Sequence, residues 1–169
     1  MNEGIKMIVF DFDGVLTDNR VLFDENGKES VFVSRADGMG INMLKSMGIE
    51  CMILSTEKNP VVSKRAEKLK INVIQGVEHK KEALKSYAQD RGIALRNILY
   101  VGNDLNDFDV MQIVGVTAVP ADAYDIVKRD ADIVLKTKGG YGVARELAEY
   151  FTKSCSEGAV CTEDTFHGK

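Results

Sequence analysis

Two patterns of apolar and polar positions alternate along the chain. Short continuous apolar runs recur at intervals, and amphipathic stretches of about 10 to 13 residues, long enough for crossover helices, lie between them. The runs are 7–10, 51–54, 73–74, 98–101, 116–119 and 133–135. Continuous runs are typical of strands in a parallel sheet that is covered on both faces. The pattern predicts a doubly wound α/β fold with ligands at the carboxyl ends of the strands.

The segment 20–34 departs from this alternation. Two short runs flank Asn26-Gly27, a residue pair favoured in type I′ turns, so the segment predicts a β-hairpin inserted into the α/β fold. Its apolar side chains include Leu22, Phe23, Val31 and Phe32. An isolated hairpin is marginally stable in water, so we expect it to pack on the protein's own core or on a neighbouring subunit.

Length and composition limit the remaining possibilities. The 169 residues predict one domain, placed at 1–152, and a tail at 153–169 that is poor in apolar residues. The net charge of -4 argues against a nucleic-acid surface, and no apolar run approaches the length that crosses a membrane. The three cysteines show no CxxC spacing, and the N-terminus lacks the pattern of a signal peptide. We therefore expect a cytoplasmic protein that binds neither nucleic acid nor membranes.

Polar residues with chemical potential follow four of the apolar runs. Asp11 and Asp13 follow the first run, and Gly14 lets the chain turn there so that backbone amides can point at an anion. The other groups are Ser55 with Thr56, Lys80, and Gly-Asn-Asp-Leu-Asn-Asp at 102–107. Each group alone is explained by a turn, a helix cap or a solvated surface. Together they supply what a phosphate site needs: hydroxyl and amide donors, a lysine, and carboxylates for a divalent cation.

In this order the four groups resemble the motifs of the haloacid dehalogenase superfamily of phosphatases. The resemblance covers residues 5–150 and includes Asp-Phe-Asp-Gly-Val-Leu-Thr at 11–17. It implies a Rossmann-like core. About 40 residues separate the first two motifs and about 25 the next two, which is too few for a large cap domain. The resemblance therefore implies the capless branch, in which the hairpin joins a homotetramer and adjoining subunits help to close the active site.

The resemblance also implies a role for each motif residue in a phosphoric monoester hydrolase. Asp11 would be the nucleophile that forms an aspartyl-phosphate, and Asp13 the general acid and base. Mg²⁺ would lie between the Asp11 carboxylate, the Asp13 backbone carbonyl and the 102–107 loop. Ser55 and Lys80 would hold the transferring phosphoryl oxygens. Asp107 would orient Lys80 or a metal-bound water.

At Asn103 the chain departs from most of the superfamily, which carries Asp there. An amide oxygen can bind Mg²⁺ but brings no negative charge, so we expect weaker metal binding if Asn103 is the ligand. Asp104 is the alternative ligand, with Asn103 favoured. Weaker metal binding leaves open a function from another class, a non-catalytic oligomerisation or regulatory domain.

Candidate substrate-binding residues follow the second motif and the hairpin. Glu57 would bond sugar hydroxyls, and Arg65 and Lys68 would attract a carboxylate. Arg35 and Asp37 resemble an element that lines the entrance of the site in the family. These residue types favour a sugar acid phosphate as the substrate.

Two further segments bear on the substrate. The sequence Ser-Thr-Glu-Lys-Asn-Pro at 55–60, together with Gly-Asn-Asp, resembles the nine-carbon sialic-type branch more than the octulosonate branch. The expected substrate is thus a 2-keto-3-deoxy sugar acid phosphate, a nonulosonate 9-phosphate ahead of 3-deoxy-D-manno-octulosonate 8-phosphate. The Gly-Gly-Tyr-Gly sequence at 139–142 resembles the family's C-terminal glycine-rich turn, where the tail approaches a neighbour's site.

Two other classes that bind phosphate on a parallel sheet do not match. A receiver domain carries an acidic pair after its first strand and the phosphorylated Asp after a later one. Here the second run ends in Ser-Thr-Glu and the third in Gln-Gly. A P-loop enzyme is excluded because the chain has no GxxxxGK[ST] sequence.

Overall fold

The predicted parallel sheet is the centre of the structure, a computed structural model that describes residues 4–156. Its six strands lie in the order β5-β4-β1-β6-β7-β8, and each neighbouring pair is parallel. Their bounds are β1 Met7–Phe10, β4 Glu50–Leu54, β5 Asn72–Ile74, β6 Ile98–Val101, β7 Val116–Val119 and β8 Ile133–Val134. The chain winds outward from β1 through β4 and β5, then returns to the other side of β1 with β6. The prediction of a doubly wound fold is confirmed.

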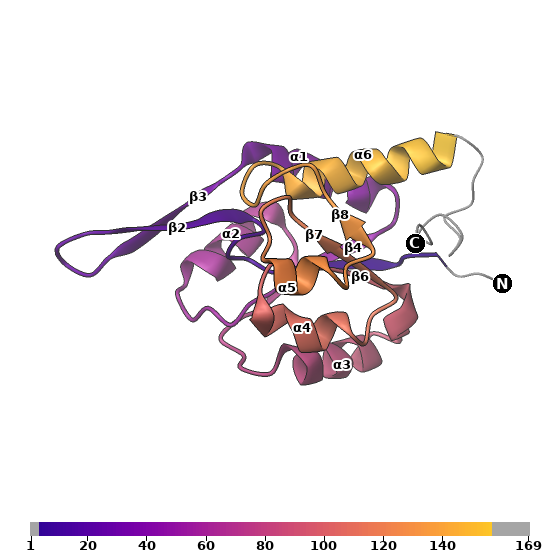
Figure 1. Cartoon of the computed structure of the whole chain (residues 1–169), viewed down its shortest axis with the longest axis horizontal. Helices are drawn as coiled ribbons and strands as arrows, with labels where there is room; N and C mark the ends of the chain where they lie inside the picture. The colour runs from indigo at the N-terminus through magenta and orange to yellow at the C-terminus, as the bar shows by residue number, and fades with distance from the viewer. Residues whose placement is uncertain (1–3, 157–169) are drawn as a thin grey trace.

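Helices cover both faces of this sheet. They are α1 Arg35–Ser46, α2 Val61–Leu69, α3 Lys80–Asp90, α4 Leu105–Met111, α5 Asp125–Lys128 and α6 Val143–Ser156. A short 3₁₀ helix at Leu95–Asn97 precedes β6. Figure 1 shows α1 and α6 side by side on one side of the sheet, with α3 and α4 on the other. Between β1 and β4 the chain adds only a hairpin and α1, so the expectation that there is no large cap domain is confirmed.

Alternate residues of β1 enter two separate cores. Ile8 and Phe10 pack with side chains of α1, α2 and α6, whereas Met7 and Val9 pack with those of α3, α4 and α5. All four residues of β1 are fully buried. Burial of each such side chain stabilises the fold by roughly 1.5 to 3 kcal/mol, which explains why the run is apolar on both faces.

The predicted hairpin is present, but its turn is not the expected one. Strands β2 Thr17–Phe23 and β3 Glu29–Val33 are antiparallel, and β2 begins earlier than the predicted segment. A type I′ turn requires positive φ at both central residues, whereas here Gly27 has a φ of 76° and Asn26 does not have a positive φ. The Gly27 amide donates to the Asp24 carbonyl, and the Asp24 side chain accepts from the amides of Asn26 and Lys28. The connection is therefore a three-residue loop that ends in a left-handed glycine.

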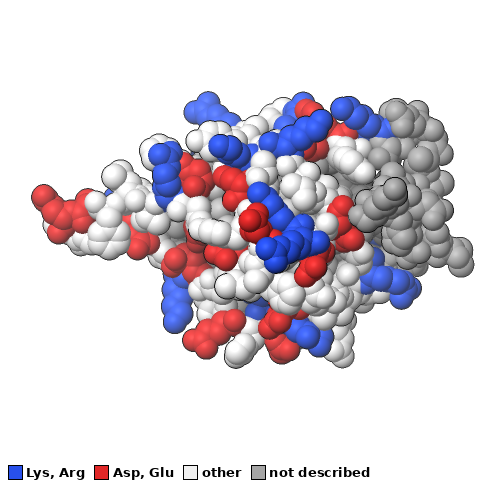
Figure 2. Space-filling view, viewed as in Figure 1, with Lys and Arg blue, Asp and Glu red and all other residues white. Residues whose placement is uncertain are grey.

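The hairpin projects away from the sheet (Figure 1), and most of its apolar side chains are exposed. Leu22 is 63% and Phe32 66% exposed, and Val21 and Phe23 are exposed as well. Val31 alone among the predicted apolar positions packs against the core. In Figure 2 the hairpin is largely uncharged on its visible face and ends in acidic side chains. The expectation that the hairpin packs on the protein's own core is therefore wrong for most of its apolar side chains, and packing on a neighbouring subunit stays a prediction.

The C-terminal part of the described chain is helical. Helix α6 continues to Ser156, so its last turn falls within the segment expected as the tail from 153. The rest of that predicted tail lies outside the described residues. None of the helices within residues 4–156 is both long and apolar enough to span a bilayer.

Candidate active site

The carboxyl ends of β1, β4 and β6 meet around a small hollow of about 80 Å³, which we call the strand-end hollow. Its lining consists of Asp11, Asp13, Asn19, Ser55, Thr56, Asn103, Asp104 and Asn106. Six of these eight residues are among the site residues that the sequence predicts. They come together because β4 and β6 flank β1 in the sheet, and parallel strands end at the same edge.

A buried ion triad shares Asp11 with the lining of this hollow. Lys80 Nζ lies 2.7 Å from Asp11 Oδ1 and 2.7 Å from Asp107 Oδ1, and all three side chains are almost completely buried. Burial, followed by the charge of Asp107, raises the pKa of Asp11 to about 7, although Lys80 opposes the shift. Burial works to lower the pKa of Lys80, but the two carboxylates outweigh it and raise the pKa. Two carboxylates share one ammonium, so the triad gains from a further cation nearby.

Asp107 is saturated with hydrogen bonds. One of its oxygens accepts from Lys80 and from the Tyr100 hydroxyl at 2.7 Å, and the other accepts from the backbone amides of Asn103 and Asp104. Asp107 therefore holds Lys80 and the 102–104 loop in place. Sequence reasoning did not single out Tyr100, although a tyrosine inside a buried apolar strand calls for a polar partner for its hydroxyl.

The turn after β1 places Asp13 beside Thr17. The Thr17 hydroxyl donates to Asp13 Oδ1 at 3.4 Å and accepts from the Gly14 amide at 3.2 Å. Burial, followed by the charge of Glu57, raises the pKa of Asp13. The Gly14 amide is therefore bonded to Thr17. Gly14 has a φ of 76°, and a Cβ there would lie 2.0 Å from Asn103 Nδ2, so glycine leaves space for the Asn103 side chain.

Asn103 and Asp104, the two alternative metal ligands, occupy different environments. Asn103 is buried beside Gly14, on the first-motif side of the hollow. The Asp104 side chain caps α4, where it accepts from the Leu105 amide at 2.7 Å and forms a capping box with Asp107. This cap satisfies free amides of the first helical turn and explains the Asp104 side chain without a metal.

The donor chemistry of the strand-end hollow fits Mg²⁺. Its lining offers carboxylate, amide and hydroxyl oxygens, which are the ligands that this ion prefers, and no sulfur. Within residues 4–156 no three side chains of the His, Cys, Asp and Glu types gather into a metal-binding group. A cation in the hollow would meet amide oxygens of asparagine side chains as well as carboxylate oxygens.

The loop after β4 bends back on itself next to the hollow. Ser55 is buried, and its hydroxyl accepts from the Glu57 amide at 3.0 Å. The Glu57 carboxylate accepts from the amides of Lys58 and Asn59, and its charge acts on Asp13. Glu57 thus lies near Asp13 without lining the strand-end hollow.

The predicted basic residues line a different hollow. Arg35, Arg65 and Lys68 surround a space of about 650 Å³ between α1 and α2, which we call the basic hollow, and it shares no lining residue with the strand-end hollow. Arg65 donates to the Ser34 carbonyl at 2.7 Å, and its buried Nε has no hydrogen-bond partner. The structure does not bring these residues together with Asp11 in one chain.

The expectation that Asp37 lines an entrance is wrong. Asp37 is fully buried, and its carboxylate accepts from the Ala144 amide at 2.9 Å, where α6 begins. Burial raises the pKa of Asp37 to about 6. A side chain that supplies an acceptor to the first turn of a helix stabilises the packing of α1 on α6.

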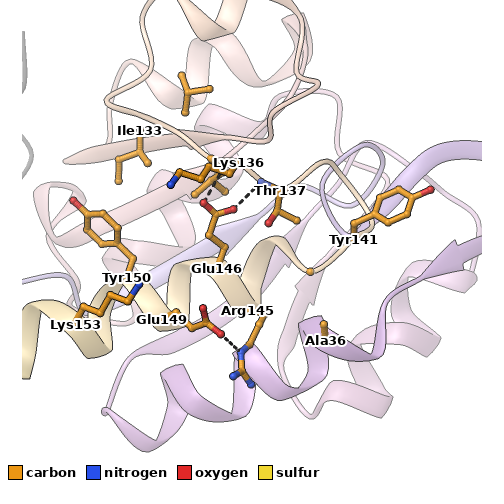
Figure 3. Close-up of a pocket in the computed structure, with 13 residues that line it drawn as sticks. Ala36, Ile133, Lys136, Thr137, Tyr141, Arg145, Glu146, Glu149, Tyr150 and Lys153 are labelled. Atoms are coloured by element: carbon orange, nitrogen blue, oxygen red, sulfur yellow. Dashed lines mark hydrogen bonds and ion pairs between the residues drawn. The ribbon is translucent and has the colours of Figure 1, made fainter.

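A third hollow of about 570 Å³ lies between β8 and α6 (Figure 3). Glu146 accepts there from the amides of Lys136 and Thr137, and Arg145 pairs with Glu149 at 2.7 Å. Dashed lines in Figure 3 mark these contacts, which join α6 to the segment after β8 and to itself. These contacts give the charged side chains of Glu146, Arg145 and Glu149 a structural role.

The glycine-rich turn at 139–142 supports the turn after β1. The Gly140 amide donates to the Val15 carbonyl at 2.9 Å. A Cβ on Gly139 would lie 2.1 Å from the Gly14 carbonyl oxygen, and one on Gly140 would lie 2.4 Å from the Asp18 amide nitrogen. Sequence reasoning related this turn to the tail. In the structure its close packing fixes the chain on which Asp11 and Asp13 lie.

Comparison with known proteins agrees with a hydrolase built on this fold and these strand-end motifs. Residues 55–147 match the family of haloacid dehalogenase-like hydrolases. The chain is also 34% identical over 148 residues to the 3-deoxy-D-manno-octulosonate 8-phosphate phosphatase KdsC of Escherichia coli K12, covering 87% of this chain and 79% of that protein. The chain belongs to the haloacid dehalogenase-like hydrolases.

Two solved structures illustrate the similarity. A protein of Streptomyces avermitilis, whose name places it in the HAD hydrolase family, is 47% identical with a TM-score of 0.85, over 89% of this chain and 86% of that one. The 3-deoxy-D-manno-octulosonate 8-phosphate phosphatase of Moraxella catarrhalis, in complex with magnesium, phosphate and KDO, is 30% identical with a TM-score of 0.85, over 89% and 87%. The predictions of superfamily, fold and phosphoric monoester hydrolase class are confirmed.

Proposed function

We propose that this protein is a Mg²⁺-dependent phosphatase that hydrolyses a 2-keto-3-deoxy sugar acid phosphate, with its activity in residues 1–152. The observation that carries the proposal is the buried Asp11–Lys80–Asp107 triad at the edge of a hollow of about 80 Å³. A hollow of this size has room for a phosphoryl group. A buried carboxylate beside a small oxygen-lined space is suited to attack phosphorus.

The side chains divide the work of two successive steps. Asp11 attacks phosphorus and forms an aspartyl-phosphate while the bond to the sugar oxygen breaks. Asp13, whose pKa is raised by burial, holds a proton for the leaving oxygen and then takes one from the water that hydrolyses the intermediate. Lys80, kept charged by two carboxylates, and the Ser55 hydroxyl stabilise the phosphoryl oxygens. The Thr56 hydroxyl and the backbone of the Gly14 turn complete the phosphate-binding region.

Mg²⁺ would be held by the Asp11 carboxylate, the Asp13 backbone carbonyl and Asn103, and would offset the repulsion between nucleophile and phosphoryl group. Asn103 is favoured over Asp104 because it is buried beside the turn after β1, whereas Asp104 caps α4. Asp107 then supports this group through Lys80 and the Asn103 amide.

The assembly belongs to the same proposal. Exposed apolar side chains on the hairpin favour a homotetramer in which copies cover one another's hairpins. Arg35, Arg65 and Lys68 line the basic hollow rather than the strand-end hollow, so they would serve the active site of an adjoining subunit. There they would attract the carboxylate of the substrate, while Glu57 would bond its hydroxyls.

Two substrates compete within the class. The nine-carbon nonulosonate 9-phosphate is favoured by the segment at 55–60 and by Asn103 in place of Asp. The eight-carbon 3-deoxy-D-manno-octulosonate 8-phosphate is favoured by the names of the curated relatives. Both substrates carry a carboxylate that Arg35, Arg65 and Lys68 would attract.

Phosphate release from a small panel of esters tests the proposal. The panel contains both sugar acid phosphates and, as an ester without the carboxylate, glucose 6-phosphate. Each assay is repeated with EDTA. We expect Mg²⁺-dependent release that is fastest from one of the two acids. A folded, Mg²⁺-supplied protein that releases phosphate from none of them would instead support a non-catalytic domain.

A further inference from the structure

Asn19 has a backbone conformation that the hairpin alone does not explain. Its φ is 62°, a left-handed value that glycine adopts most easily and that asparagine adopts more readily than most other residues. Within residues 4–156, Lys70 is the one other non-glycine residue with positive φ, and it has an ordinary position at the end of α2. Asn19 instead lies inside β2, where the pairing with β3 shifts register between Thr17 and Val21.

This conformation places Asn19 at the rim of the strand-end hollow. Asn19 lines the hollow together with Asp11 and Asp13. Its amide donates to the Thr17 hydroxyl at 3.2 Å, and that hydroxyl also donates to Asp13 Oδ1. Thr17 therefore ties the position of Asn19 to that of the proposed general acid.

The residues on either side of Asn19 have hydrogen-bond or ion-pair partners, whereas the Asn19 side chain has none within the described residues. Asp18 and Arg20 form an ion pair at 2.6 Å, and the Arg20 amide also bonds Asp18. Gly140 packs within reach of the Asp18 backbone and holds the chain just before Asn19. The Asn19 carboxamide is exposed and makes no hydrogen bond within the described part of the chain. A constrained backbone thus presents an unpaired donor and acceptor next to the reacting groups.

The size of the hollow indicates what this carboxamide meets. With the phosphoryl group in a hollow of about 80 Å³ beside Asp11, the leaving group lies next to the other lining residues, among them Asn19. Thr56 and Asn106, which contact each other at 3.5 Å, belong to the same lining as Asn19 but come from the loop after β4 and from α4. A carboxamide can both donate to and accept from hydroxyl groups, which suits a polyhydroxylated leaving group.

We propose that Asn19 is a specificity-determining residue that hydrogen-bonds the polyhydroxylated leaving group next to the oxygen that Asp13 protonates. This inference rests on the proposed function, because it needs a sugar phosphate as the substrate. It explains why an unfavourable backbone conformation is kept at a position where glycine would be more stable.

Asn19→Gly tests the proposal because it removes the carboxamide and favours the same φ. We compare kcat/KM for the sugar acid phosphate that the wild type hydrolyses fastest with kcat/KM for p-nitrophenyl phosphate, whose leaving group has no sugar hydroxyls. The ratio of the two values should fall about tenfold, as expected for the loss of a hydrogen bond to substrate. The melting temperature should stay the same or rise. Asn26→Gly, at the exposed tip of the same hairpin, is the control and should leave the ratio unchanged.

Each other outcome overturns the inference. An unchanged ratio in Asn19→Gly means that the carboxamide does not contact the leaving group, and the proposed function then still stands. An equal loss on both esters with a lower melting temperature assigns Asn19 a structural role. A wild type that hydrolyses no sugar phosphate removes the proposed function and this inference together.

Discussion

The ion triad under the strand-end hollow and the projecting hairpin break the usual rules of burial in opposite directions. Lys80, Asp11 and Asp107 are charged yet almost completely buried. Leu22 and Phe32 are apolar yet more than 60% exposed, at 63% and 66%. The triad pairs two carboxylates with one ammonium, so a small cation would balance its charge. The apolar side chains of the hairpin lack a covering surface within residues 4–156, and a patch of this kind is typical of an interaction site.

The hairpin nevertheless reaches the reacting carboxylates, and Thr17 makes one of these contacts. Thr17 is the first residue of β2, and its hydroxyl holds both Asp13 and the amide of Gly14. The comparison therefore teaches that the base of the hairpin and the position of Asp13 are linked through this buried side chain. The predictions below separate the two regions and then test their link.

The largest effect is expected from Asp11→Asn. An amide is a negligible nucleophile towards phosphorus, so turnover should fall by at least about 10³-fold. Steady-state phosphate release measures it, and Asp109→Asn, an exposed change on α4, is the control. Substantial activity in Asp11→Asn would remove the triad from the reaction.

Lys80→Met should cost both activity and stability. It leaves two buried carboxylates without their cation, and loss of one partner of a buried ion pair costs about 3 kcal/mol. With EDTA present, the melting temperature of this variant should be higher at pH 5 than at pH 8. The reason is that a buried carboxyl group whose pKa is raised in the folded state makes the folded protein less stable as the pH rises. The wild type should show a weaker form of this trend up to about pH 7, the pKa of Asp11.

Thermal unfolding across this pH range is the measurement. Lys85→Met, an exposed change on the same helix, should follow the wild-type curve. A flat pH profile for Lys80→Met would show that the carboxylates do not depend on Lys80 for their stability.

Phe32→Lys tests the hairpin. A charge in the middle of the exposed apolar surface should dissociate the assembly into folded monomers and lower activity several-fold, because active sites would lose their neighbours. Sedimentation velocity and phosphate release on the same samples report both effects. A fully active monomer would show that the hairpin contributes nothing to the reaction.

The smallest effect is expected from Asn103→Asp. The added negative charge should lower the Mg²⁺ concentration for half-maximal activity several-fold, while Asp104→Asn should change it little, since asparagine caps a helix as well as aspartate does. Mg²⁺ titrations of both variants decide between the two ligands. Loss of Mg²⁺ activation in Asp104→Asn alone would reverse the assignment.

Strand positions were predictable because they depend on local apolar runs. The motif residues of the strand-end hollow were predictable for the same reason, since each follows a run such as 7–10 or 98–101. The hairpin's turn type was not, because the Asp24 side chain bonds two loop amides and stabilises another turn. The preference of the Asn-Gly pair for a type I′ turn does not take account of the hydrogen bonds that a neighbouring side chain can make.

Features that depend on tertiary contact were missed. The role of Tyr100 requires that β6 bring its hydroxyl to Asp107, and that of Asn19 requires the register shift in β2. The separation of Arg65 from Asp11 depends on which side of the sheet α2 covers. Sequence spacing carries no information on such distances.

The lengths of the outermost strands have a consequence for how copies of this chain add to one another. The margins of the main sheet are β5 with three residues and β8 with two, so they offer few open amides and carbonyls to a foreign strand. The ribbon of β2 and β3, with seven and five residues, has much longer open margins. If copies of this chain pair through strand edges, this ribbon is therefore where a closed ring or an open fibre would be decided. A solubility-enhanced variant needs lysine or proline only there.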